Sequence, residues 1–203
     1  MKTSAYLYEK GVFKILDQDL GIEMEDSFAV PEQVLHIEEG REGIVPAFFS
    51  GVAECVRHDK ILKSRSSYKN GLLHGPCFSF FTNGTKASER WYRKGLLHGR
   101  AIDKCSSGQI VSEKGFFDGK PHGAFTLWYP SGKTLSTGAY EFGRSTGTFK
   151  VFDEEGLLLR STDFKNGRRH GIDQGWTDDG FLLFCEAWEN GEKKKSIVKD
   201  FLL

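Results

Sequence analysis

Four histidines recur at a regular spacing and are the first residues to test for chemistry, because imidazole ligates metals and moves protons near neutral pH. They are His74, His98, His122 and His170, and each directly precedes a glycine at a spacing that is a multiple of 24 residues. A catalytic site needs unlike residues in one place, whereas these histidines stand at equivalent places. Copies about 10 Å apart, as strand spacing implies, are too far apart to share a metal. We therefore expect each imidazole to hydrogen-bond local backbone beside a glycine of unusual φ.

The remaining candidates for chemistry are weak. The segments GRSTG at 143–147 and SSGQ at 106–109 resemble phosphate loops but lack the G-x-x-x-x-G-K-[ST] pattern, and both fall in register with turns of neighbouring repeats. Nothing near His36 or His58 suggests a catalytic triad. The cysteines at 55, 77, 105 and 185 are widely spread without a C-x-x-C pair, which favours reduced packing thiols. The sequence thus predicts a protein that is not an enzyme, with no catalytic residues, no metal site and no cofactor.

Composition narrows the class of partner. The 203 residues contain 28 Lys and Arg and 28 Asp and Glu, so the formal net charge is zero, which argues against a nucleic-acid partner and against a membrane-lipid partner. No apolar run is long enough for a membrane span, and the N-terminus carries charges where a signal peptide has its apolar stretch. We expect a cytoplasmic protein, with export by a route without a cleaved signal left open.

The elements that must position these residues follow from a strict repeat. Of 24 glycines, 17 fall into three series with a 24-residue period. The series are Gly51, Gly75, Gly99, Gly123, Gly147 and Gly171; Gly71, Gly95, Gly119, Gly143, Gly167 and Gly191; and Gly84, Gly108, Gly132, Gly156 and Gly180. The glycine content therefore reflects repetition and not disorder.

Each repeat reads as a β-hairpin. After Gly75 the run PCFSFFT favours a strand, Asn83-Gly84 supplies a turn, KASERWYR returns, and the next turn comes at Lys94-Gly95. Parallel pairing would need longer crossovers than these turns allow. We predict an all-β fold, an elongated antiparallel sheet or groove of repeated 24-residue hairpins that advances roughly 10 Å per repeat.

Two aromatic series keep the same register, and an even period keeps each series on one face of the sheet. The first comprises Tyr68, Tyr92, Phe116, Tyr140, Phe164 and Trp188. The second comprises Phe80, Trp128, Phe152 and Trp176, with Lys104 in its second place and Tyr129 beside Trp128. We expect the first series to pack within the array. For the second series, packing and partner binding stay open, and Phe80, Trp128, Tyr129, Phe152 and Trp176 are the candidate partner-binding residues.

The aromatic and glycine positions, with the segments NGLLHG, KGLLHG and NGRRHG, resemble a MORN repeat over about residues 51–194. More narrowly, they are similar to the variant MORN repeats of bacterial proteins, including those labelled YwqK-like antitoxins. The resemblance implies a twisted array of antiparallel hairpins forming an open groove that holds a protein partner or scaffolds an assembly. Lys104 and Cys105 depart from the paired aromatics at Phe80-Phe81 and Trp128-Tyr129, and the sixth copy ends in GEKKK without His-Gly.

We divide the chain into a segment at 1–48, a repeat array of five to six units at 49–195 and a tail at 196–203. The first segment has four basic and ten acidic residues, a net charge of −6, and is expected to cap the first edge strand, with a recognition or secretion element as the alternative. It should contain a hairpin about Glu9-Lys10-Gly11 and a short helix from Pro31 through Val34 and Leu35. The tail should cap the last repeat as a strand or short helix, with an exposed interaction tail as the alternative. The run Lys193–Lys195 should be a solvated end of the array and not a lipid contact.

These observations favour a non-enzymatic protein-interaction scaffold whose aromatic-lined groove receives an extended or helical segment of another protein. The alternatives are an antitoxin-like inhibitor of a neighbouring toxin and, in third place, a lipid-surface adaptor. Nothing in the sequence identifies the partner or the oligomeric state.

Overall fold

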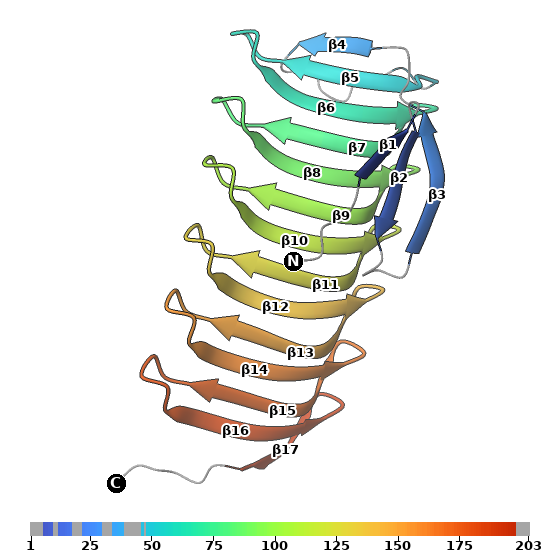
Figure 1. Cartoon of the computed structure of the whole chain (residues 1–203). Coiled ribbons are helices and arrows are strands. Elements are labelled where there is room, and N and C mark those ends of the chain that lie inside the picture. Colours follow the sequence, from blue (N-terminus) through green and yellow to red (C-terminus); the bar gives the residue numbers. More distant parts are fainter. Residues whose placement is uncertain are drawn as a thin grey trace. The chain divides into compact units, whose positions relative to one another are not determined.

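The structure is a computed structural model that describes residues 6–9, 12–17, 22–29, 34–38, 46 and 48–197, and every regular element in them is a β-strand (Figure 1). The strands are β1 (Tyr6–Glu9), β2 (Val12–Asp17), β3 (Ile22–Ala29), β4 (Val34–Glu38), β5 (Gly51–Val56), β6 (Leu62–Lys69), β7 (Leu72–Phe80), β8 (Lys86–Arg93), β9 (Leu96–Lys104), β10 (Ile110–Phe117), β11 (Lys120–Trp128), β12 (Thr134–Glu141), β13 (Arg144–Phe152), β14 (Leu158–Lys165), β15 (Arg168–Trp176), β16 (Leu182–Glu189) and β17 (Glu192–Ser196). Within these ranges there is no helix that is long and apolar enough to cross a membrane.

The strand order confirms the predicted fold class. Strands β4 to β17 belong to one open sheet in which each strand follows its neighbour in sequence, as hairpins without crossovers require. The repeat strands pair antiparallel, for example β7 with β8 and β15 with β16, whereas β4 runs parallel to β5. The sheet is therefore mixed at its first edge and built from hairpins elsewhere.

The first segment contains one confirmed prediction and one error. Strands β1 and β2 pair antiparallel with Glu9 opposite Val12, so a hairpin lies where we expected it, and β3 extends it to a separate three-stranded sheet. The helix predicted through Val34 and Leu35 is wrong, because these residues belong to β4 and pair with Val52 and Ala53 of β5. The backbone of β5 offers an open edge, and pairing with it decides the conformation of a segment too short for its own pattern to do so. The end of the chain after Ile197, and with it most of the predicted tail, lies outside the described residues.

Two kinds of turn alternate along the repeats. At the two-residue turns both central residues have positive φ, as at Lys94 (50°) and Gly95 (82°), which is the type I′ geometry that suits hairpins. At the longer turns one residue has positive φ, which is Lys60 (65°) in the first turn and a glycine in the later ones. Gly84 (81°) donates its N–H to Phe81 O at 3.0 Å, and Phe81 N–H donates to Thr85 O at 2.8 Å. The longer turn is accompanied by a β-bulge in the returning strand. The glycine series that begin at Gly71 and Gly84 therefore serve the two kinds of turn.

Replacing Gly95 or Gly119 with valine is expected to lower the free energy of unfolding by more than about 1 kcal/mol, because a β-branched residue is strained at positive φ. A Cβ at Gly95 would meet its nearest atom, Cδ2 of Leu72, at 3.8 Å, so backbone strain and not crowding is responsible. The matched control is Gly95→Asn, since asparagine tolerates this conformation. Urea unfolding measures the difference, and unchanged midpoints in both valine variants would contradict the assignment of the turns.

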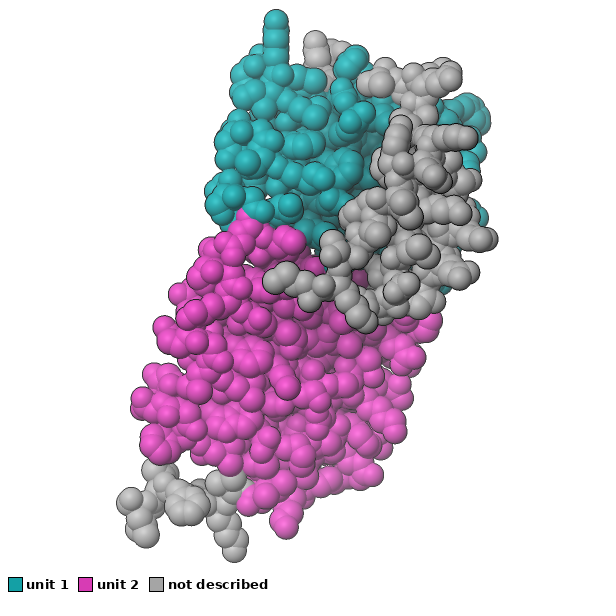
Figure 2. Space-filling view, viewed as in Figure 1, with its two compact units in different colours: residues 1–108, 116–119 teal, residues 109–115, 120–203 magenta. Residues whose placement is uncertain are grey.

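The chain divides into two compact units (Figure 2). The first comprises the described residues up to Gly108 with Phe116–Gly119, and the second comprises Gln109–Gly115 and the described residues from Lys120 onward. In the first unit the most buried apolar residues include Val52, Ala53 and Trp91, and in the second they are Phe125 and Cys185. All four cysteines are free thiols, which agrees with the predicted packing role.

Candidate functional site

The histidines bond the backbone, as we predicted, but their partner is the turn of the next repeat and not the local backbone that we expected. In each case Nδ1 accepts a hydrogen bond from the backbone N–H of the first residue in the type I′ turn twenty residues later. The donors to His74, His98, His122 and His170 are Lys94, Asp118, Phe142 and Asn190, at 3.3 to 3.4 Å. Next to this bond, the N–H of the turn glycine donates to the carbonyl just before the histidine, as from Gly95 to Leu73 O at 2.8 Å. The imidazoles therefore tie one repeat to the next.

His98 is the most elaborate member of this series. It is 1 % exposed, its Nδ1 lies 3.0 Å from Oδ1 of Asp118, and its ring packs on Phe117 at 4.9 Å between centroids. Arg93 donates to the same carboxylate oxygen at 2.9 Å. The hydrogen bond from Arg93 lowers the pKa of the Asp118 carboxyl below its ordinary value. This arrangement stabilises the turn at Asp118.

The segment GRSTG at 143–147 matches the G-x-S-x-G motif of the nucleophile elbow. That elbow needs a sharp turn from a strand into a helix. Here Gly143 ends a type I′ hairpin turn, and Ser145 lies in β13 opposite Tyr140 of β12. Ser145 is thus part of a continuous strand pair and lacks the elbow geometry. The side chains in the described ranges also form no group of three or more His, Cys, Asp and Glu placed to hold a metal ion.

An aromatic cluster forms the packed interior of the second unit. Phe149 contacts Phe125, Tyr140 and Phe164 with ring centroids 4.9 to 5.5 Å apart, and Phe125 also contacts Tyr140 at 5.5 Å. Gly138 lies opposite Phe125, and a Cβ there would be 2.6 Å from Phe125 Cε1 and 2.9 Å from two atoms of Phe149. The rings occupy the space above this glycine. Tyr140 and Phe164 therefore pack within the array, as we predicted for their series.

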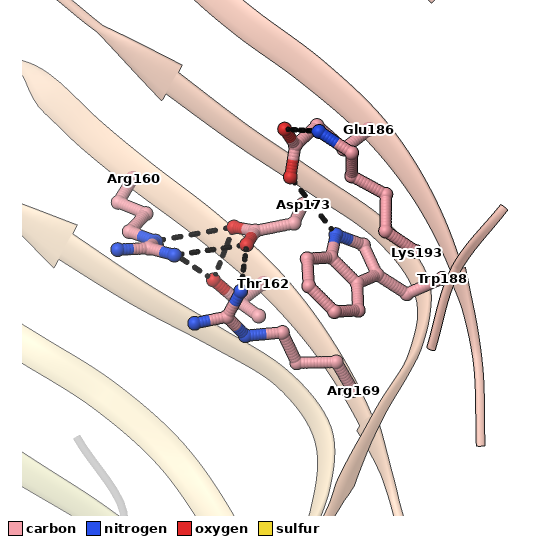
Figure 3. A network of polar contacts seen from close by, with 7 residues as sticks. All are labelled: Arg160, Thr162, Arg169, Asp173, Glu186, Trp188 and Lys193. Carbon is pink, nitrogen blue, oxygen red and sulfur yellow. Dashed lines mark hydrogen bonds and ion pairs between the residues drawn. The ribbon is translucent and has the colours of Figure 1, made fainter. Parts of the chain in front are cut away.

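Beside this cluster the last repeats carry a network of charges (Figure 3). Asp173, which is 1 % exposed, accepts hydrogen bonds from Arg160 Nε (3.1 Å), Arg160 Nη2 (2.8 Å) and Thr162 Oγ1 (2.7 Å), and its Oδ2 lies 3.3 Å from Arg169 Nη1. The guanidinium of Arg169 stacks over the ring of Trp188 at 4.6 Å. These contacts pair a buried carboxylate with two partly exposed arginines.

Glu186 forms the second centre of this network. Its Oε2 accepts a hydrogen bond from Trp188 Nε1 at 3.2 Å, and its Oε1 accepts one from Lys193 at 2.9 Å. Trp188 thus connects the two carboxylates, since Arg169 covers its ring. Lys193 belongs to the basic run Lys193–Lys195, whose side chains are exposed as expected for a solvated end.

The environment of Asp173 explains how a carboxylate tolerates burial. Burial alone raises the pKa of Asp173, but the hydrogen bonds from Arg160 and Thr162 and the charge of Arg169 outweigh it, so the pKa lies below its ordinary value. The same hydrogen bond to Asp173 raises the pKa of Arg160. Asp173 and Arg160 are therefore both ionised at neutral pH, and their ion pair has a structural role.

The candidate partner-binding residues fall in both units. Phe80 ends β7 in the first unit, where it is partly buried and its carbonyl accepts a hydrogen bond from Arg57 at 2.8 Å. Trp128, Phe152 and Trp176 end β11, β13 and β15 in the second unit and are partly exposed. Tyr129 follows Trp128, and its hydroxyl donates to the Phe152 carbonyl at 3.0 Å, so this hydroxyl holds neighbouring repeats together.

Sequence reasoning missed a group of exposed apolar residues that lie at the same ends of the strands as Phe152 and Trp176. Phe181 is 72 % exposed, Leu183 61 %, Leu182 40 % and Leu157 36 %. Leu182 is opposite Trp176 across the β-bulge, and Leu158 is opposite Phe152 in the same way. We name the set Trp128, Phe152, Leu158, Trp176 and Leu182 the apolar edge, and the exposed Leu157 and Phe181 lie in the turns that adjoin it. The signal in the sequence was the pair of runs GLLL and GFLL directly after the turns at Gly156 and Gly180, since the earlier repeats have a polar residue directly after this glycine, namely Thr85, Gln109 and Lys133.

Comparisons with known proteins assign no function to this site. A scan against protein-family models gave no match to this chain, and a search of curated proteins gave none either.

Proposed function

We propose that this chain is a non-enzymatic protein-binding module that holds a segment of another protein against the apolar edge of its second unit. The observation that carries the proposal is the exposure of Leu182 opposite Trp176, with the still more exposed Phe181 in the adjoining turn, where its carbonyl accepts a hydrogen bond from Thr177. Large apolar side chains that gather at one place on a surface favour association, because covering them removes apolar area from water.

The arrangement of the edge supports this function. Trp128, Phe152 and Trp176 each occupy the last position of a strand, so backbone pairing holds them in place before a partner arrives. Aromatic residues on a rigid support lose little conformational freedom on binding and are frequent binding hot spots. The resemblance of the repeats to MORN repeats agrees with a binding role, and we propose membership of that repeat class on the same grounds.

Site-specific photo-crosslinking tests the proposal. A photoreactive phenylalanine analogue placed at Phe181 should capture one or a few proteins from native lysate, and the same analogue at Phe142 should not. Phe142 is the matched control, because it is also apolar and 53 % exposed but lies at a type I′ turn, at the opposite ends of the strands. The same set of proteins captured from both positions would contradict the proposal.

A further inference from the structure

The apolar edge has a spacing that selects among kinds of bound segment. Phe152 and Trp176 end strands that are two apart in the sheet, so they are separated by roughly 10 Å. Leu158 and Leu182 come from the intervening strands, at steps of about 5 Å. Residues that share one face of an α-helix recur every three to four residues, which is about 5 Å, and every seven, which is about 10.5 Å.

An extended segment fits the same edge less well. Its side chains on one face repeat about every 6.6 to 6.8 Å, which matches neither the step between neighbouring strands nor twice that step. A helix lying across the strands therefore brings one apolar residue to each strand end in turn, whereas an extended chain loses register after the first contact.

Charge at the border of the edge narrows the partner further. The turn that precedes Leu157 contains Glu154 and Glu155, and the turn that precedes Phe181 contains Asp178 and Asp179; all four acids are exposed. No lysine or arginine occurs in 153–159 or 177–183. The preceding turn of the same unit, Pro130-Ser131-Gly132, carries no acid. Negative charge is thus concentrated beside Phe152 and Trp176.

The two acidic turns are held in shape by their own hydrogen bonds. Asp153 Oδ1 accepts the N–H of Leu157 at 2.7 Å, and Thr177 Oγ1 accepts the N–H of Phe181 at 2.9 Å. The backbone that carries the exposed acids is consequently held just beyond the strand ends at Phe152 and Trp176. A partner with basic residues along the matching side gains attraction and fast association, and an acidic partner or an anionic lipid surface is repelled.

We propose that the segment bound at the apolar edge is an amphipathic α-helix with apolar residues at heptad spacing and lysine or arginine along one flank of that stripe. This inference rests on the proposed function and specifies its partner. Trp128, Phe152 and Trp176 contact the apolar stripe, and the turns at Glu154-Glu155 and Asp178-Asp179 face the basic flank.

Three synthetic peptides of roughly 21 residues, or three heptads, test the proposal by fluorescence anisotropy. The first has leucine at the a and d positions with lysine on one flank, the second replaces these lysines by glutamate, and the third permutes the first so that its leucines share no face. We expect the lysine peptide to bind at least about tenfold more tightly than the other two, with an affinity that falls as salt rises.

Variants of the chain separate the two parts of the proposal. Neutralising the turns with Glu154→Gln, Glu155→Gln, Asp178→Asn and Asp179→Asn should bring the lysine and glutamate peptides to within about twofold of each other. The matched control, Glu141→Gln with Glu189→Gln, removes exposed acids at the other ends of the strands and should leave the ratio unchanged. The triple variant Trp128→Ala, Phe152→Ala, Trp176→Ala should abolish binding of the lysine peptide.

Each contrary outcome has a definite meaning. If the lysine and glutamate peptides bind equally well, the partner does not need a basic flank. If the permuted peptide binds as well as the lysine peptide, the partner does not need an apolar helix face. If no peptide binds while the analogue at Phe181 still captures a protein, the inference fails and the proposed function survives. If the analogue at Phe181 captures nothing beyond the control at Phe142, the proposed function fails as well.

Discussion

Replacing Phe125 by alanine is expected to lower the free energy of unfolding of the second unit by about 3 kcal/mol. Phe125 is 8 % exposed, and its ring packs against Tyr140 and Phe149 in the space that Gly138 leaves open. Alanine removes the ring and leaves a cavity, because the strands on either side are fixed by backbone hydrogen bonds and cannot close it. Urea unfolding, with hydrogen exchange of the amides in β11 to β14 as a local reading, measures the loss.

The matched control for this prediction is Phe152→Ala, which removes the same ring from the partly exposed apolar edge. It should cost about 1 kcal/mol, since less apolar area leaves the interior. The double variant Phe125→Ala, Phe149→Ala should cost less than the sum of the single variants, because the two rings touch and each single change already removes their contact. A cost for Phe125→Ala no larger than that for Phe152→Ala would show that the cluster is not the core of this unit.

The 24-residue register was sufficient to predict the backbone of the repeats. A turn such as Lys94-Gly95 depends on two adjacent residues at positive φ, and glycine in the second place identifies it at every repeat. That His74 and its equivalents bond backbone was predictable for the same reason, since a residue that recurs with the turn serves the turn, but their partner in the next repeat was not. The strand β4 was not predictable, because pairing with β5 decides its conformation and the pairing partner lies outside its local sequence.

The side-chain interior was harder to predict than the backbone. The position occupied by Phe125 and Phe149 is alanine at 53 and 101, cysteine at 77 and aspartate at 173, so no residue type recurs there. A search for positions that keep one residue type in every repeat does not detect this core position. The packing depends instead on complementary pairs across the sheet, as with Phe125 and Gly138, and such pairs become visible only when the strand register is known.

In the candidate site, too, the residues that recur with the repeat could be predicted and those that do not recur could not. Trp128, Phe152 and Trp176 were found because they recur, and the structure places them at equivalent strand ends. The residues that distinguish their surroundings, Phe181 and the acids of the two last turns, do not recur through the array. A repeat protein is stabilised by what its repeats share, and it distinguishes partners by where they differ. The departures from the register are accordingly the best guide to the binding surface.

Replacing Asp173 by asparagine is expected to lower the free energy of unfolding by about 2 kcal/mol. The change removes the charge that Arg160 and Arg169 share, and the amide also places donors where these arginines donate. The cost stays below the 3 to 5 kcal/mol typical of a broken buried pair, because the arginine side chains are 44 % and 39 % exposed and water can solvate them. Thr162→Val removes the hydrogen bond from Thr162 Oγ1 to Asp173 and the one that Oγ1 accepts from Arg160, but it keeps the ion pairs of Asp173, so it should cost only about 1 kcal/mol.

The repeat itself supplies a rescue that separates a structural network from a binding one. Phe149, Ser136 and Gly138 are the residues one repeat earlier than Asp173, Arg160 and Thr162, so the triple variant Asp173→Phe, Arg160→Ser, Thr162→Gly rebuilds the aromatic packing of the preceding repeat, including its open space opposite the ring. A buried ion pair replaced by well-packed apolar groups is often neutral in stability, so the triple variant should recover most of the loss seen with Asp173→Asn. The melting temperatures of the unmodified chain, of Asp173→Asn and of the rescue variant test this expectation. Failure of the rescue, with unfolding as early as in Asp173→Asn, would show that the last repeats need the charges themselves and that the aromatic packing of Phe125 and Phe149 does not transfer along the array.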